Sequence, residues 1–296
     1  MYRYRIYCLE LQSDIEFPQL LVSNSDSDPD VIISERDIGR DAGVPQDIKY
    51  EIGEEVSWLE NSTCYLRIEN GNRITYSLKE GGNRKYILTY ILGWGMAMLA
   101  YQRNELAMHC SVVSNDNGAV LICGESGCGK STITTAFLES GYRFMADDMA
   151  FVSTIDGISY VKPAFPYQKL CADAAMASGC PSEDMIYIDE MKDKYLIPYR
   201  GEYIDAPVRI RTIIILFRCE EEKVIRKEIK GIDKLHACLN NTFLRRLLKE
   251  HMYLPKTGSL GLGIAGSVSM YAIGRPDGRD TREEVIRECQ AAVFPS

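Results

Sequence analysis

The chain has 296 residues and a net charge of -8, and 46% of its residues are hydrophobic and 26% charged, which is ordinary for a soluble globular enzyme of one or two domains. The acidic balance argues against a nucleic-acid partner, because a nucleic-acid-binding face is normally rich in lysine and arginine. The longest apolar run, residues 90–101, is too short for a bilayer, which takes roughly 20 apolar residues, so no membrane segment is expected.

Residues 1–85 have the pattern of a small β-rich module. Short runs that alternate polar and apolar residues, such as YRYRIYCLEL, TCYLRIE and RITYSLK, are separated by NSDSDPD, ENGN and EGGN. Alternation is typical of half-buried strands, and asparagine and glycine tolerate the positive φ of tight hairpin turns. We therefore expect a β-rich N-terminal domain over residues 1–85, with a hairpin at ENGN.

The periodicity changes at residue 86. Residues 86–102 are strongly apolar with helical spacing, and the small residues Gly93, Gly95 and Ala97 allow close packing. Beyond residue 105, the runs AMHCSVV, GAVLICG, FMADDMAFV and RTIIILF are predicted as buried strands with helices between them. Because strands that alternate with helices indicate an α/β sheet, the second domain is expected to span residues 86–296.

A glycine-rich loop lies at the centre of this second domain. GESGCGKS matches the pattern GxxxxGK[ST], directly after the apolar run AVLIC and directly before the helix-like STITTAFLES. Glycines let backbone N–H groups curl toward phosphate oxygens, and the following helix adds the positive end of its dipole. The residues expected to bind nucleotide phosphates are Gly124, Glu125, Ser126, Gly127, Cys128, Gly129, Lys130, Ser131 and Thr132. In this motif the lysine, Lys130, reaches the β and γ phosphates, and the hydroxyl of Ser131 ligates Mg²⁺.

Two adjacent carboxylates, Asp147 and Asp148, follow in MADD, inside an apolar segment predicted as a strand. Burying a carboxylate without a partner is costly, so a cation or a hydrogen-bond donor is expected beside them. In a phosphotransfer site, one aspartate accepts the proton of an incoming hydroxyl while the other helps to hold magnesium. The alternative is structural, with a carboxylate that caps a helix or meets an arginine.

The ordered set of His109 in AMHCSVV, the loop GESGCGKS and the following GYRFMADD resembles the catalytic core of HPr serine kinase/phosphorylase. The chain is more similar still, over most of its length, to the HPr-kinase-like proteins encoded beside lasso-peptide and other ribosomal-peptide genes. The resemblance implies an α/β P-loop kinase domain with a central mixed sheet (HPr kinase/PEP carboxykinase-like), preceded by a small β-rich N-terminal domain. It also implies ATP and Mg²⁺ as cofactors and a peptide or small-protein acceptor.

Carried onto this sequence, the resemblance makes Asp147 the base toward a seryl hydroxyl and places Asp148 and Ser131 around magnesium. Lys130 and the loop amides hold the donor phosphates. His109 lies beside the loop, where it either orients Asp147 or is a buried structural histidine.

Three cations are further candidates for the substrate or its phosphate. Lys194 and Arg200 flank YLIPY and could neutralise the transferring phosphoryl group, and together with Lys169 they could meet a carboxylate of the acceptor. The same residues are equally compatible with a solvated face. His236 and His251 stand in a charged helix-like segment and are expected at the surface.

Two features limit the resemblance. The signature E-[VI]-R-G-[LI]-G of true HPr kinase/phosphorylases is missing, and IDEMKDKYLIPYRG occupies that region, which leaves phosphorylase activity and HPr itself open. A second glycine-rich run, SLGLGIAGSV at residues 259–268, has no following lysine and is predicted as a flexible or strand-bordering turn.

The sequence therefore favours an ATP- and Mg²⁺-dependent kinase of a serine or threonine hydroxyl, with a modified ribosomal peptide or its precursor as the leading acceptor by resemblance. A small-molecule kinase, an HPr-type protein serine kinase and a non-catalytic nucleotide-binding module remain alternatives, and MADD disfavours the last. The ten cysteines form no CxxC pair and no secretory signal is visible, which predicts a reduced, cytoplasmic protein. HPr-kinase relatives form hexamers, so a homo-oligomer is left open.

Overall fold

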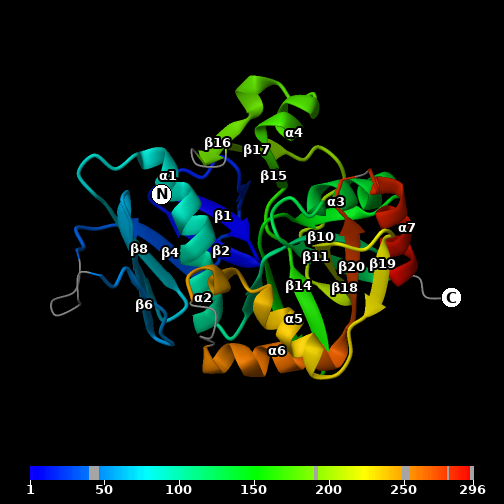
Figure 1. Ribbon diagram of the computed structural model, residues 1–296. Helices are drawn as coiled ribbons and strands as arrows, with labels where there is room; N and C mark the ends of the chain where they lie inside the picture. Colours follow the sequence, from blue (N-terminus) through cyan, green and yellow to red (C-terminus); the bar gives the residue numbers. More distant parts are fainter. Residues whose placement is uncertain (40–46, 190–192, 249–253, 279, 294–296) are drawn as a thin grey trace. The chain divides into compact units, whose positions relative to one another are not determined.

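The computed structural model describes residues 1–39, 47–189, 193–248, 254–278 and 280–293 (Figure 1). His251 lies outside these residues. The chain divides into two compact units, each built from two segments of sequence. Unit 1 comprises Met1–Glu105 and Lys169–Pro198, and unit 2 comprises Leu106–Gln168 and Tyr199–Ser296.

The described part of unit 1 contains an eight-stranded sheet with the strand order β3-β1-β2-β4-β8-β7-β6-β5. Its strands are β1 (Tyr2–Ile6), β2 (Leu9–Ser13), β3 (Leu21–Val22), β4 (Val31–Glu35), β5 (Tyr50–Glu51), β6 (Val56–Glu60), β7 (Cys64–Glu69) and β8 (Arg73–Leu78). The hairpin expected at ENGN joins β7 to β8, and Asn70 and Gly71 take φ values of 52° and 63° in its turn. Here local turn chemistry decides the structure.

A helical segment follows this sheet, as the apolar periodicity predicts. It consists of α1 (Arg84–Tyr90), the π-helical turn η1 (Ile91–Gly95) and α2 (Met96–Gln102). Both η1 and α2 contact β7, and a Cβ on Gly95 would lie 3.6 Å from Ile74 Cδ1 of β8. These helices pack on the eight-stranded sheet, so they belong to unit 1. The first segment of unit 1 therefore ends at Glu105, whereas the sequence analysis expected a boundary after residue 85.

The second segment of unit 1 belongs to an excursion of the chain between β14 and β18 of unit 2. Its described residues form a three-stranded sheet in the order β15-β17-β16. The elements are β15 (Tyr167–Cys171), α4 (Ala172–Ala177), the 3₁₀ turn η2 (Ser182–Asp184), β16 (Ile186–Asp189) and β17 (Lys194–Pro198). Strand β16 contacts α1 of the same unit, which ties the two segments together.

Unit 2 is a mixed α/β structure, and its described residues form a nine-stranded sheet. The strands are β9 (Leu106–Met108), β10 (Cys110–Asn115), β11 (Gly118–Gly124), β12 (Arg143–Ala146), β13 (Ala150–Ile155), β14 (Ile158–Lys162), β18 (Val208–Cys219), β19 (Ile225–Glu228) and β20 (Ser269–Pro276). The main path runs β12-β10-β11-β18-β14-β13-β9, and β20 pairs with β18 and β19. Strands β11, β18 and β20 are parallel to one another, and the remaining pairs are antiparallel.

Helices cover this sheet. Helices α3 (Lys130–Glu139) and α7 (Arg282–Val293) contact each other and the parallel strands, and they share an apolar core that includes Ile122, Phe137 and Cys289. Helix α6 (Pro255–Ser267) contacts β9, β13 and β14, and α5 (Ile232–Asn240) packs on α6 (Figure 1). A short 3₁₀ turn, η3 (Phe243–Arg246), follows α5 and contacts β9.

Two expectations about local structure are wrong. SLGLGIAGSV is part of helix α6 and not a turn, because its glycines allow close packing: a Cβ on Gly261 would lie 2.9 Å from Leu235 Cδ1, and one on Gly263 would lie 3.0 Å from Thr154 Oγ1. The aspartates of MADD do not stand inside a strand, because residues 147–149 form the connection between β12 and β13. Among the described residues, no helix is both long enough and apolar enough to cross a membrane.

Phe137 should be a large contributor to the stability of unit 2. Its side chain is 1% exposed, and its ring meets that of Tyr142 with centroids 4.9 Å apart. Phe137→Ala should lower the free energy of unfolding by about 3–5 kcal/mol, measured by urea denaturation. Glu139→Ala, an exposed change on the same helix, is the control and should have an effect within about 0.5 kcal/mol. Equal losses in the two variants would contradict the assigned core.

Candidate active site

The topology of unit 2 gathers three chain segments at one edge of its sheet. Strand β11 ends at Gly124, beside Leu216 of the parallel strand β18. Strand β10 is antiparallel to β11 and starts at Cys110, opposite Cys123, and β12 pairs its last residue, Ala146, with Val112. The residues that flank these strands therefore meet: the loop after β11, His109 before β10, and the two aspartates after β12.

The loop between β11 and α3 depends on glycine. Gly124, Gly127 and Gly129 have φ values of 135°, 84° and 101°, which side chains rarely adopt. A Cβ on Gly124 would lie 2.4 Å from the carbonyl oxygen of Leu216, so no larger residue fits while the strands stay paired. Helix α3 starts at Lys130 with no side-chain cap, so the N–H groups of its first turn are not satisfied by a capping side chain.

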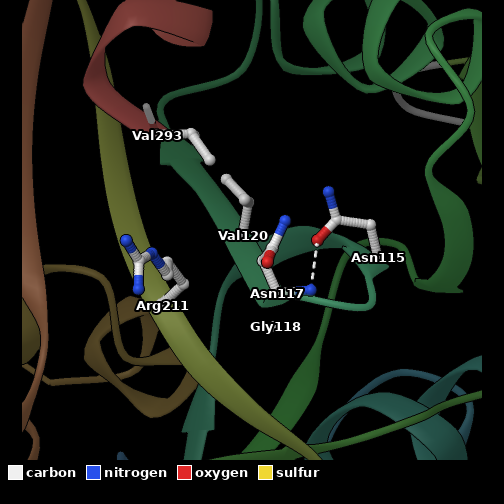
Figure 2. A pocket seen from close by; sticks show the side chains of 6 residues that line it. All are labelled: Asn115, Asn117, Gly118, Val120, Arg211 and Val293. Atoms are coloured by element: carbon white, nitrogen blue, oxygen red, sulfur yellow. Dashed lines mark hydrogen bonds between the residues drawn. The ribbon is translucent and has the colours of Figure 1, made fainter. Parts of the chain in front are cut away.

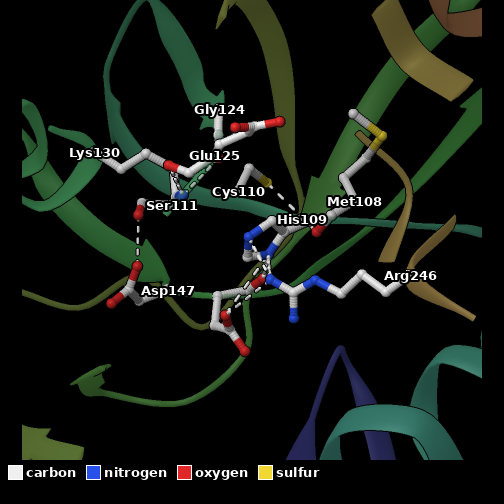
Figure 3. A network of polar contacts seen from close by, with 10 residues as sticks. Met108, His109, Cys110, Ser111, Gly124, Glu125, Lys130, Asp147 and Arg246 are labelled. Atoms are coloured by element: carbon white, nitrogen blue, oxygen red, sulfur yellow. Dashed lines mark hydrogen bonds and ion pairs between the residues drawn. The ribbon is translucent and has the colours of Figure 1, made fainter. Parts of the chain in front are cut away.

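The side chains of the loop differ in what they can offer a ligand. The ammonium of Lys130 donates to the carbonyl oxygens of Gly124, at 2.6 Å, and Glu125, at 3.1 Å, so it lies over the start of the loop (Figure 3). Ser126 and Gly127 are exposed and Ser131 is half-buried. Cys128 is buried in the core of unit 2, so only its backbone can face a ligand.

The two aspartates are held differently. The Ser111 hydroxyl donates to Oδ1 of Asp147 at 2.5 Å, from the neighbouring strand β10. Asp148 has a φ of 68°, a left-handed conformation that aspartate tolerates better than most residues. The N–H of Met149 donates to the Asp147 carbonyl at 2.9 Å and closes the turn. The connection therefore presents two half-buried carboxylates from one tight turn.

His109 is fixed by two partners that determine its tautomer. Its Nδ1 lies 2.7 Å from the backbone carbonyl oxygen of Asp148, and a carbonyl only accepts. Its Nε2 lies 2.6 Å from Nη2 of Arg246, and a guanidinium only donates. Both contacts are satisfied by a neutral ring that carries its proton on Nδ1 and accepts at Nε2.

The surroundings of His109 favour the same neutral form. Burial is the main cause that lowers the pKa of His109, Asp148 opposes it, and the nearby charges of Arg246 and Lys130 add to it, so that the resulting pKa is about 4. His109 contacts Asp148 and Arg246, and Asp147 accepts from Ser111. A role of His109 in orienting Asp147 stays a prediction.

Three residues of this edge were not singled out from the sequence. Ser111 lies in AMHCSVV, a run in which only His109 was given a role, and Arg246 follows 137 positions after its partner His109. Arg218, at the end of β18, donates to the Gly127 carbonyl at 3.3 Å and pairs with Asp277 at 3.4 Å. Each of the three is brought to the site by contacts between segments far apart in the sequence, so the residues next to it in the sequence do not reveal its role.

The three predicted substrate cations are divided between the two units. Lys169, in β15, and Lys194, in β17, belong to unit 1, whereas Arg200 is an exposed residue of unit 2. Their roles toward a substrate stay predictions.

The residues of this edge fit a nucleotide and a magnesium ion. Curled glycines, the uncapped start of α3 and Lys130 are the groups that bind phosphate oxygens in such loops. Among the described residues, no cluster of three or more His, Cys, Asp or Glu side chains is arranged to hold a metal. Mg²⁺ needs fewer protein ligands, because it keeps several waters and shares phosphate oxygens, so the Ser131 hydroxyl and the Asp148 carboxylate would be sufficient.

A separate cavity of about 130 Å³ opens at the start of β11 (Figure 2). It is lined by Asn115, Asn117, Gly118, Val120, Arg211 and Val293. The glycine-rich loop follows the other end of the same strand, so this cavity is not part of the candidate active site.

Comparisons with known proteins add little. No protein-family model matches the chain, and no curated protein does. Among solved structures, it is similar to the HPr(Ser) kinase/phosphatase of Coxiella burnetii, with 14% sequence identity and a TM-score of 0.32, over 62% of this chain and 93% of that one. A TM-score this low does not establish a shared fold.

The neutral state of His109 should make stability depend on pH. The folded ring stays neutral down to a pKa of about 4, whereas an unfolded histidine binds a proton near its ordinary value of 6.5. The unfolded state therefore binds more protons between these values, and stability should fall as pH drops from about 6.5 to about 4. The free energy of unfolding is measured by urea denaturation at pH 7 and at pH 5. Between these two values it should fall by about 2 kcal/mol more in the wild type than in His109→Gln.

His236→Gln, at an exposed position on α5, is the matched control for this measurement and should keep the wild-type pH dependence. A wild-type loss that persists unchanged in His109→Gln would contradict the assignment.

Proposed function

We propose that unit 2 is a P-loop kinase that transfers the γ-phosphate of ATP, with Mg²⁺, to a serine or threonine hydroxyl. The observation that carries the proposal is the meeting, at one sheet edge, of a phosphate-binding type of loop with a pair of carboxylates. Strand β11, which leads into the loop, and strand β12, which leads into the aspartate turn, both pair with β10. A module that only binds nucleotide has no need of a second carboxylate.

In this proposal the residues divide the work of phosphoryl transfer. The loop N–H groups and Lys130 hold the β and γ phosphates, while Ser131 and Asp148 hold the magnesium ion, which would supply charge neutralisation when bound. Asp147, oriented by Ser111, accepts the proton of the acceptor hydroxyl while the hydroxyl oxygen forms a bond to the γ-phosphorus. The bond to the β,γ-bridging oxygen breaks, and ADP leaves.

The acceptor we propose is a peptide or small protein, with a ribosomally made peptide of the lasso type, or its precursor, as the first candidate. The support for it is the sequence resemblance of His109, GESGCGKS and GYRFMADD to the kinases encoded beside such peptides. Lys169, Lys194 and Arg200 are the cations we propose for a carboxylate of that acceptor. A small-molecule acceptor and an HPr-type protein are the alternatives.

The direct test is mass spectrometry of candidate acceptors after incubation with the protein, ATP and Mg²⁺. The panel should include precursor peptides with and without serine near the C-terminus, an HPr-type protein and hydroxyl-bearing metabolites. A phosphorylated serine or threonine on a peptide supports the full proposal, and phosphorylation of a metabolite alone would overturn its acceptor. Nucleotide binding without any transfer or ATP hydrolysis would favour the non-catalytic alternative.

Lys130→Ala should abolish phosphoryl transfer and greatly weaken ATP binding, because it removes the charge that meets the β and γ phosphates. Binding is measured by calorimetry and transfer by the mass-spectrometric assay. Lys234→Ala, a half-buried lysine that donates to the Val268 carbonyl at 2.7 Å, is the control for loss of a lysine in the same unit. Undiminished turnover in Lys130→Ala would refute the role of the loop.

Asp147→Asn keeps the shape of the side chain and removes the base. ATP affinity should survive, while transfer falls by roughly 10²–10⁴-fold, the usual contribution of general base catalysis. Asp148→Asn should instead weaken the dependence of ATP binding on magnesium. If the two variants show the opposite pattern, the two roles are exchanged.

A further inference from the structure

A cation from a distant part of the chain reaches the candidate active site. Arg246 ends the 3₁₀ turn η3 and is placed by Phe243, whose ring lies 4.8 Å from the guanidinium carbon. Its Nη2 lies 2.6 Å from His109 Nε2 and 4.0 Å from Asp148 Oδ1. Figure 3 shows the guanidinium approaching the histidine on the side away from Cys110.

The anchoring of Arg246 uses only part of its hydrogen-bonding capacity. A guanidinium has five N–H donors, and within the described part of the chain its polar contacts all involve Nη2. Its side chain is 41% exposed, whereas that of His109 is 15% exposed. The arginine is therefore held at one nitrogen by a buried neutral ring while Nη1 and Nε remain as donors.

The charges around the site leave a role for this cation. A γ-phosphate between Lys130 and the base Asp147 would bring negative charge close to two carboxylates, which repel it. Arg246 contacts His109, which precedes β10, and Lys130 follows the loop after β11, the strand that pairs with β10. The two cations therefore reach the same end of the sheet from different elements. Cations aimed at a transferring phosphoryl group lower the barrier by stabilising the charge on its oxygens.

We propose that Arg246 binds the oxygens of the transferring phosphoryl group through Nη1 and Nε, while His109 holds Nη2 as a positioning residue. This inference rests on the proposed function and adds to it the second cation of the reaction. Arg246 supplies charge and hydrogen bonds and exchanges no proton. The proton of the acceptor hydroxyl still passes to Asp147, and the bridging oxygen still leaves with ADP.

The test compares binding of ADP with binding of ADP plus aluminium fluoride, a mimic of the transferring phosphoryl group, each with Mg²⁺, by calorimetry. Arg246→Ala should weaken binding of the mimic by at least about 10²-fold, in keeping with the rate effects of about 10³–10⁵-fold that such arginines have. Affinity for ADP alone should change by less than about 3-fold, because ADP lacks the group that the arginine meets.

Arg245→Ala removes the neighbouring arginine of the same turn, whose Nη1 donates to the Leu248 carbonyl at 3.2 Å. It is the matched control and should bind both probes like the wild type. Added guanidinium ion should partly restore mimic binding to Arg246→Ala, which a merely misfolded variant would not show. Equal weakening of both probes, or of neither, would overturn the inference while the kinase proposal stands on wild-type transfer. If the wild type binds neither probe, both proposals fail.

A double-variant comparison tests the part assigned to His109. If His109 acts by holding Arg246, His109→Ala should weaken mimic binding, and adding His109→Ala to Arg246→Ala should cost almost nothing more. Fully additive losses would show that His109 acts by itself and would overturn its positioning role.

Discussion

The close approach of the Gly124 backbone to the Leu216 carbonyl is the constraint on which the rest of the site depends. With no Cβ at Gly124, β11 and β18 stay paired to the last residue of β11, and the chain can then turn at once into the loop. A wider separation would move the start of α3 away from the sheet edge where His109 and the aspartate turn lie. The position of Lys130 relative to the carboxylates thus follows from one backbone contact between parallel strands.

His109 shows how a neutral group can organise charged ones. A charged imidazole at this position would meet a guanidinium donor at Nε2 and lose that hydrogen bond. A neutral ring with its proton on Nδ1 instead links a backbone carbonyl to a cation without adding charge of its own. The neutral histidine therefore positions Arg246 without neutralising its charge, and that charge is available to an anionic ligand.

The parts of the structure that sequence reasoning reached are those set by local chemistry. The hairpin at Asn70 and Gly71, the helical segment after residue 84 and the strand, loop and helix around Lys130 each follow from a few adjacent residues. What it missed is set by contacts between distant residues. In the helix at residues 255–267, Gly261 and Gly263 allow close packing against Leu235 and Thr154. The approach of Arg246 to His109 depends on how the chain returns after α5.

The division of both units into two segments bears on how the protein is made. A ribosome that has released residues 1–105 has not yet supplied residues 169–198, which complete unit 1, and unit 2 waits for the residues after 198. Neither unit can finish folding before most of the chain has been synthesised, although domains usually fold in turn from the N-terminus. A cut after residue 105 would separate the two segments of unit 1 and leave both segments of unit 2 in one fragment, so only unit 1 would lose its connection. In the nascent chain, the first segment of unit 1 keeps apolar surface uncovered until residues 169–198 have been made.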